Sequence, residues 1–116
     1  MDHVRRLLDH AFRLGIRVKL LLLDAGYYSA DVINYLNSAG IKFIMRMPDF
    51  GNIGAGSDFM YTSNRHKDKQ ATFRVVAFNG KDKYGHKELF IFATNTDISP
   101  RKIRKAFRKR WRLHTG

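Results

Sequence analysis

The chain of 116 residues has no cysteine, only two prolines and fewer than half as many acidic residues as basic ones. Without cysteine it forms neither disulfides nor thiolate metal sites, which fits a reducing compartment. No apolar run approaches the roughly 18 residues that a membrane-spanning helix needs, so we expect no membrane partner. The N-terminus "MDHVRRLLDHAFRLG" lacks the continuous apolar centre of a signal peptide, which predicts a cytoplasmic location.

Positive charge is the strongest feature of the composition. The chain carries 22 Lys+Arg against 10 Asp+Glu, a formal net charge of +12. A polyanion is the natural partner for such a surface, most often nucleic acid. Hydrophobic residues at 44% indicate a globular domain, and this length is enough for one domain with a real core. The charge predicts the sign of the partner, but it does not predict a reaction.

The first 47 residues have the pattern helix, strand, helix, strand. A helix is predicted over residues 3–14, ending at Gly15, because apolar side chains recur at helical spacing in Val4, Leu7, Leu8, Ala11 and Phe12. The apolar run in "IRVKLLLLD" predicts a strand buried on both faces. Ser29 is a good N-cap for a second helix that ends at Gly40, and "IKFIMRM" predicts a second strand. Short connections make this a βαβ unit, whose strands are parallel.

The second half of the chain is rich in β signals. Residues 49–70 are predicted to be mostly loop, with one short strand at residues 59–62. "ATFRVVAF" and "ELFIFATN" predict a hairpin, with "NGKDKYGHK" as a long basic loop. A solvated loop is the simplest interpretation of its cations, and phosphate contact is the alternative. Ser99 and Pro100 then begin a basic C-terminal helix.

One acid stands out, because Asp24 directly follows the four leucines of the first predicted strand. In parallel α/β sheets, metals and ligands bind at the carboxyl ends of strands, so Asp24 is a candidate metal-binding or catalytic carboxylate. The alternative is that Asp24 caps the turn by accepting hydrogen bonds from the amides that follow. Tyr27 likewise has two interpretations, stacking on a nucleic-acid base or packing at the sheet edge.

The C-terminal helix places two polar residues on its apolar face. At 100° per residue, Ile103, Phe107, Arg110 and His114 share one side, so Arg110 and His114 are predicted to point inward. An inward arginine needs a carboxylate or a phosphate, and Asp24 or a bound nucleic-acid backbone would supply one. The remaining cations are predicted to fan outward: Arg101, Lys102, Arg104, Lys105, Arg108, Lys109 and Arg112. The alternative is a solvated basic helix with a narrow apolar stripe.

Two segments together resemble a known family. "LLLDAGYYSADVINYLNSAGIKFIMRMP" looks like the region around the second catalytic aspartate of DDE-type insertion-sequence transposases. "FATNTDISPRKIRKAFRKRWRLHTG" is similar to their C-terminal Tyr-x2-Arg-x3-Glu signature, with Phe107, Arg110 and His114 at its three positions. The resemblance implies an α/β fold with a partial RNase H-like core in residues 1–47, a β-hairpin insertion in 48–97 and the basic helix in 98–116.

The resemblance also implies phosphodiester chemistry on DNA with two Mg²⁺ or Mn²⁺ ions held by three carboxylates. Asp24 matches the second carboxylate, whereas His114 stands at the glutamate position and only a helix precedes the strand of Asp24. We therefore expect a fragment of a transposase catalytic domain with negligible activity alone. The residues expected to contact DNA are Arg110, Lys105, Arg108, Lys109, Arg112 and Tyr27.

The resemblance implies further strands upstream, one of them carrying the first aspartate, and only a helix precedes the strand of Asp24 here. The missing strands would leave a sheet edge exposed at the strand of Asp24, which predicts self-association or poor solubility, with a homo-oligomer as one form of self-association. Two functional alternatives stay open at this point. One is a non-catalytic, basic nucleic-acid-binding module whose affinity depends only on charge. The other is a small ribosome-associated or RNA-binding protein.

Overall fold

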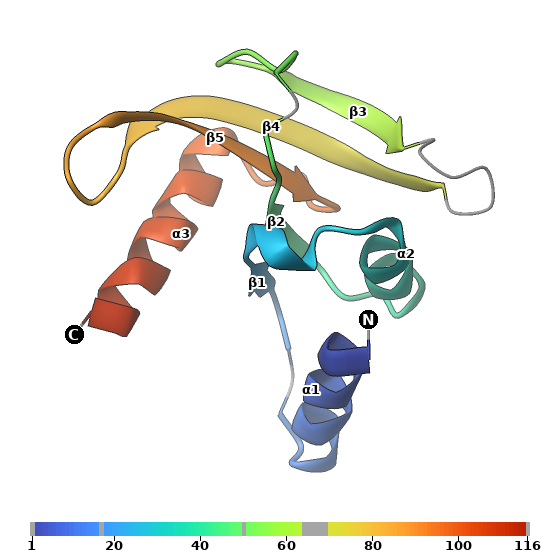
Figure 1. Ribbon diagram of the computed structural model, residues 1–116. Coiled ribbons are helices and arrows are strands. Elements are labelled where there is room, and N and C mark those ends of the chain that lie inside the picture. The colour runs from blue at the N-terminus through green and yellow to red at the C-terminus, as the bar shows by residue number, and fades with distance from the viewer. Residues whose placement is uncertain (1, 17, 50, 64–69, 116) are drawn as a thin grey trace.

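The computed structural model describes residues 2–16, 18–49, 51–63 and 70–115, with side chains in the last helix described as far as Phe107. Figure 1 shows the arrangement of its elements. In chain order these are α1 (Asp2–Arg13), β1 (Leu21–Leu23), the 3-10 turn η1 (Ala25–Tyr27), α2 (Ala30–Ser38), β2 (Phe43–Arg46), β3 (Asp58–Ser63), β4 (Ala71–Lys81), β5 (Lys87–Thr94) and α3 (Pro100–Thr115).

The strands form one five-stranded mixed sheet in the order β1-β2-β5-β4-β3. β1 and β2 are parallel, as the strand-helix-strand pattern predicts. β5 is antiparallel to both β2 and β4, so the predicted hairpin continues the same sheet as the βαβ unit. Among the described strands, β1 and β3 are the two edges. The fold is α/β, consistent with a partial RNase H-like core.

Two apolar clusters lie on the opposite faces of this sheet. α1 and α2 contribute to the first cluster and α3 to the second, and Figure 1 shows α2 and α3 on opposite sides of β1 and β2. The neighbours Phe43 and Ile44 are both fully buried, one in each cluster. Because successive side chains of a strand point to opposite faces, packing on both faces explains the unbroken apolar run in β2.

The starts of α2 and α3 agree with the capping signals in the sequence. The Val32 amide donates a hydrogen bond to Ser29 Oγ at 3.1 Å, and the Lys102 amide donates one to Ser99 Oγ at 3.3 Å. Gly40 follows α2 with φ at +69°, a conformation that favours glycine. None of the helices in the described part of the chain combines the length and the apolar character that a bilayer crossing requires.

The apolar stripe predicted for α1 is only partly buried. Val4 and Leu8 are in the first cluster, but Leu7 is 55% exposed and Phe12 is 52% exposed. The helix packs through Val4 and Leu8, which are four residues apart on one line of side chains, so Leu7 and Phe12 on either side of that line face solvent. β1 is also less buried than predicted. Only Leu23 is fully buried, because the strand lies at the sheet edge.

The predicted hairpin loop is shorter than expected. Lys81 pairs with Lys87 in the β4–β5 register, so the loop comprises only residues 82–86. Asp82 Oδ1 accepts hydrogen bonds from the amides of Tyr84 and His86 at 2.8 and 2.9 Å, which closes the turn. Gly85 adopts φ +82° there. The short strand predicted near residues 59–62 is confirmed as β3.

Candidate functional site at the carboxyl end of the parallel strands

Asp24 is exposed and directly follows β1. It lies at the end of the sheet where the parallel strands β1 and β2 terminate. It is the N-cap residue of η1 and has an extended backbone, yet its side chain makes no capping hydrogen bond. The turn is held by the backbone instead, since the Asp24 carbonyl oxygen accepts from the Tyr27 amide at 3.1 Å. The carboxylate therefore does not close this turn.

The two tyrosines after Asp24 pack against the protein. Tyr27 is half-buried and stacks with His3, with the ring centroids 6.1 Å apart and the planes inclined by 16°. Tyr28 meets Phe73 edge-on at 6.0 Å. Tyr27 thus fixes α1 to the turn that carries Asp24, as the packing interpretation predicts. Contact between Tyr27 and a nucleic-acid base stays a prediction.

A metal ion held by three carboxylates does not fit the residues that the structure describes. Among them, no group of three or more His, Asp or Glu side chains is placed to hold a cation. Asp24 has the right chemistry for Mg²⁺ and the right place in the sheet, but it is a single ligand. The side chain of His114 lies outside the described residues.

The first half of α3 packs as its sequence predicts. Ile103 is fully buried, and Phe107 lies against Phe92 with the ring centroids 4.6 Å apart. The exposed cations of this half are Arg101, Lys102, Arg104 and Lys105. The side chains of Arg108, Lys109, Arg110, Arg112 and His114 lie outside the described residues, so the inward placement of Arg110 and His114 stays a prediction.

The sequence interpretation missed the partners of Arg46, which ends β2. Arg46 Nη2 forms an ion pair with Glu88 Oε1 at 2.5 Å, and the guanidinium lies 4.6 Å from the centroid of the Phe90 ring. An arginine next to an apolar run is a signal for a charged or polar partner. The partner itself could not be identified, because Glu88 is 42 residues further along the chain.

Arg74 on β4 is a second charged residue that the sequence interpretation missed. Its Nε and Nη2 donate to the two oxygens of Asp58 at 2.6 and 2.7 Å, and its Nη1 donates to the Ile98 carbonyl at 2.6 Å. The hydrogen bond from Arg74 is the largest cause of a lowered pKa at Asp58, and the same bond raises the pKa of Arg74. One side chain therefore joins β3, β4 and the segment before α3.

Comparison with known proteins supports the resemblance. A family model of the transposase DDE domain matches residues 1–113. No curated protein and no solved structure matches the chain significantly. The family match includes Asp24, the βαβ unit, the β4–β5 hairpin and most of α3. Because it covers nearly all of the chain, this protein belongs to the transposase DDE domain family.

Proposed function

We propose that this chain takes part in transposition as a DNA-binding portion of a transposase catalytic domain, with Asp24 facing the phosphodiester that reacts. The observation that carries the proposal is the place of Asp24, exposed at the carboxyl end of β1 beside the parallel β2. The net charge of +12 gives the affinity for a polyanion that such a role needs. Lys105 and its neighbours on α3 would contact backbone phosphates.

The family's chemistry uses divalent metal ions, and among the described residues no group of three or more His, Asp or Glu side chains could hold one. Asp24 would be one of the carboxylate ligands. β1 has an outer edge with no described neighbour, where a strand carrying a further carboxylate would pair. A single carboxylate on the surface binds Mg²⁺ weakly, so we expect negligible nuclease or strand-transfer activity from this chain alone.

Nicking of supercoiled plasmid in Mg²⁺ and in Mn²⁺ tests this expectation, with Asp24→Asn as the matched variant. We expect no nicking from either protein and similar DNA binding by both in the absence of metal. Metal-dependent nicking that disappears in Asp24→Asn would contradict the expected inactivity, because it would require a complete site that includes Asp24.

A second candidate function is a nucleic-acid-binding module without a metal role, favoured by the lack of a three-ligand group among the described residues. The affinity of such a module for DNA would fall steeply with salt. It would not change on addition of Mg²⁺ or on the substitution Asp24→Asn. Tighter DNA binding in Mg²⁺ that is lost in Asp24→Asn would support the transposase role. Preference for structured RNA over duplex DNA at matched salt would count against both.

Replacing His114 with glutamate tests whether α3 contributes to the same site. The family resemblance places a glutamate there, so His114→Glu is expected to strengthen Mg²⁺ binding, measured by calorimetry. The double variant Asp24→Asn with His114→Glu is the control and should lose the gain. Unchanged Mg²⁺ affinity in His114→Glu would argue against a shared site.

A further inference from the structure

The outer edge of β3 is not covered by any strand that the structure describes. Figure 1 shows β3 along that side of the sheet, with β4 as its neighbour. Every residue of β3 except Ser63 is exposed. Proteins commonly protect such an edge with lysine or proline, because its unpaired amides and carbonyls bind another strand readily. The sequence of β3, DFMYTS, has neither residue, so this edge is open to strand pairing.

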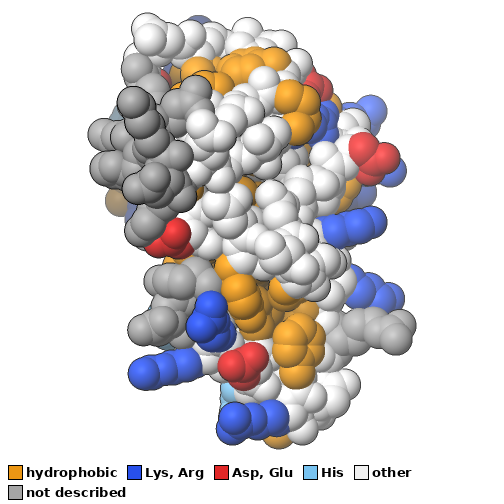
Figure 2. All heavy atoms as spheres, turned by 90° about the vertical axis from the view of Figure 1, so that its right-hand side faces the viewer, with side chains coloured by type: hydrophobic (Ala, Val, Ile, Leu, Met, Phe, Trp, Pro, Cys, Tyr) orange, Lys and Arg blue, Asp and Glu red, His pale blue; other side chains and the backbone are white. Residues whose placement is uncertain are grey.

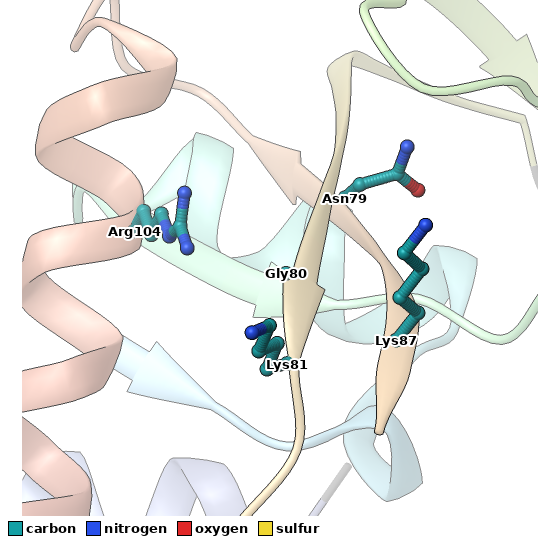
Figure 3. Close-up of a pocket in the computed structure, with 5 residues that line it drawn as sticks. All are labelled: Asn79, Gly80, Lys81, Lys87 and Arg104. Atoms are coloured by element: carbon teal, nitrogen blue, oxygen red, sulfur yellow. The ribbon is translucent and has the colours of Figure 1, made fainter. Parts of the chain in front are cut away.

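β3 has no basic residue that would attract DNA to this edge. The cations Lys81 and Lys87 lie on the hairpin beyond the part of β4 that pairs with β3, and Figure 3 shows them with Arg104 of α3. The single charged residue of β3 is Asp58, whose two oxygens accept from Arg74 at 2.6 and 2.7 Å. Because phosphate contacts need cations, the edge of β3 suits a polypeptide strand rather than a nucleic acid.

The pairing with β4 determines which backbone groups of β3 point outward. Ala77 of β4 donates its amide to the Ser57 carbonyl at 2.9 Å, so the backbone groups of Ala77 face β3. Hydrogen-bonded and non-hydrogen-bonded pairs alternate along an antiparallel ladder. The next hydrogen-bonded pairs in the register are therefore Phe59–Val75, Tyr61–Phe73 and Ser63–Ala71. The remaining residues of β3 direct their amides and carbonyls to the outer edge: Asp58, Met60 and Thr62.

A second copy of β3 matches these outward groups when it runs antiparallel about a two-fold axis at Met60. Met60 is then opposite Met60 of the second copy, and Asp58 is opposite Thr62. Each of these pairs exchanges two hydrogen bonds, so every outward amide and carbonyl of β3 finds a partner. Moving the axis to Phe59 would leave Thr62 without a partner on the other β3, and moving it to Tyr61 would leave Asp58 without one. The axis at Met60 is therefore the register that pairs the strand completely.

The same register also matches the side chains. Phe59 is opposite Tyr61 of the second copy, and these two side chains are 41% and 42% exposed in the single chain. Tyr61 already meets Phe73 with the ring centroids 5.7 Å apart, so the pairing would extend this aromatic contact across the joint. Opposite aromatic residues stabilise an antiparallel pair, and opposite like charges destabilise it. No like charges are opposite each other here, because Asp58 faces Thr62.

We propose that the outer edge of β3 binds β3 of a second copy of this chain about a two-fold axis at Met60, which joins the two sheets into one. Such an interface is isologous, as in most homodimers. An axis perpendicular to the sheet keeps each face on its own side, so both basic α3 helices lie on the same face of the joined sheet. One strand pair is a small interface, so the association is weak and depends on concentration. The inference does not depend on the proposed function, because the pairing involves neither DNA nor metal.

Disulfide cross-linking tests the register directly, because the chain has no cysteine of its own. Phe59→Cys and Tyr61→Cys are prepared separately, checked for folding by thermal unfolding, and oxidised alone and as an equal mixture. Directly opposite residues are close enough for a disulfide, whereas residues offset by two positions are about 7–8 Å apart. Leu7→Cys, at an exposed position of α1, measures the background from random collisions.

We expect the mixture to form covalent dimer about tenfold faster than either cysteine variant alone or Leu7→Cys, because only the mixture places two thiols opposite each other. A second variant, Met60→Pro, removes an outward amide and leaves the hydrogen bonds to β4 intact. It should stay monomeric in sedimentation velocity at concentrations where the wild type associates. Tyr61→Pro is the matched contrast, since its amide faces β4 and its loss should lower the unfolding temperature.

Three outcomes would overturn the inference. Cross-linking of Phe59→Cys alone or Tyr61→Cys alone that matches the mixture would exclude the axis at Met60. Association that persists in Met60→Pro would assign the contact to another surface. A wild-type chain that stays monomeric at high concentration, with cross-linking at the level of Leu7→Cys, would exclude the dimer. None of these results bears on the proposed function, which the DNA-binding and nicking experiments test separately.

Discussion

Arg74 shows how much of the fold depends on a single side chain. Its side chain is only 16% exposed, and its guanidinium donates to Asp58 on β3 and to the carbonyl oxygens of Thr96 and Ile98 before α3. Arginine suits this position because its planar donors reach several acceptors at once, which a lysine ammonium does not do. Without Arg74 these carbonyl groups would lose a donor, and β3 would lose a link to the segment that begins α3.

Replacing Asp58 with asparagine should make the free energy of unfolding less dependent on pH in the acidic range. Arg74 lowers the pKa of Asp58 below its ordinary value of 3.8. A carboxyl group with a lowered folded pKa stabilises the fold above its unfolded pKa, and this contribution disappears as pH falls through the folded pKa. We expect the variant to be about 1 kcal/mol less stable at pH 7, since the Asp58 side chain is 41% exposed.

Urea unfolding at pH 7 and at a series of values below 4 measures the effect. The two proteins should converge in stability as Asp58 becomes protonated in the wild type. A difference that stays constant through the acid range would show that the ion pair contributes little.

Gly80→Ala should destabilise the protein because Phe90 fills the space that the new methyl group needs. The nearest ring atoms would be 2.5 and 2.8 Å from the added Cβ. Overpacking of this kind costs about 1–3 kcal/mol. The double variant Gly80→Ala with Phe90→Leu should recover part of the loss, which a double-mutant cycle in urea would reveal. Additive effects of the two substitutions would argue against the close contact.

At the scale of elements, Asn95 joins the end of β5 to the start of β2. Its Oδ1 accepts from the amide of Phe43 at 2.9 Å, and its Nδ2 donates to the Ile41 carbonyl at 2.9 Å and to Asn37 Oδ1 at 3.0 Å. Thr94, the last residue of β5, donates through its Oγ1 to the Phe43 carbonyl at 2.6 Å. These side chains extend the β2–β5 ladder beyond the last paired residues.

Asn95→Ala should therefore lower the free energy of unfolding by about 1–3 kcal/mol, because the buried Phe43 amide would lose its acceptor. Asn95→Asp is the informative control, since it keeps the acceptor for Phe43 and loses the donor to Ile41. It should be intermediate at pH 7. If alanine and aspartate gave equal losses, the Phe43 amide would not depend on Asn95.

The elements themselves could be predicted where the signal is local. Ser29 and Ser99 cap the helices that their positions predict, and Asp24 lies at the carboxyl end of a strand, as its place after four leucines indicates. Interactions across the sequence could not be predicted. Nothing near Arg46 or Arg74 in the sequence identifies Glu88 or Asp58 as its partner, and a single sequence does not show that β5 pairs with β2.

At the scale of the whole molecule, large apolar side chains are exposed at α1, on β3 and in the hairpin loop. Figure 2 shows hydrophobic side chains reaching the surface in more than one area of the face in view. Among the residues whose side chains are described, the large exposed apolar ones are Leu7, Phe12, Leu14 and Ile16 in or after α1, Phe59, Met60 and Tyr61 on β3, and Tyr84 in the hairpin loop. β3 combines such side chains with an outer edge that no described strand covers.

Self-association through the β3 edge is therefore expected at high concentration, and Met60→Lys should reduce it. Met60 is 66% exposed and lies directly opposite Arg74 in the β3–β4 register, so lysine there adds a charge that opposes strand pairing and costs about 0.2–1 kcal/mol of stability through repulsion from Arg74. Sedimentation velocity over a concentration series measures the association. Leu7→Lys on α1 is the matched control, and a larger effect from it would assign the contact to α1 instead.

The sheet order has a consequence for how the chain is made on the ribosome. β2 leaves the exit tunnel early, but its second neighbour is β5, which is synthesised only after β3 and β4. The apolar face of β2 that α3 covers in the folded protein is exposed to other proteins during this time. It stays exposed until Ile103 and Phe107 have been synthesised and pack on it. Nascent chains of this protein should therefore need a chaperone such as a ribosome-bound holdase until α3 has been synthesised.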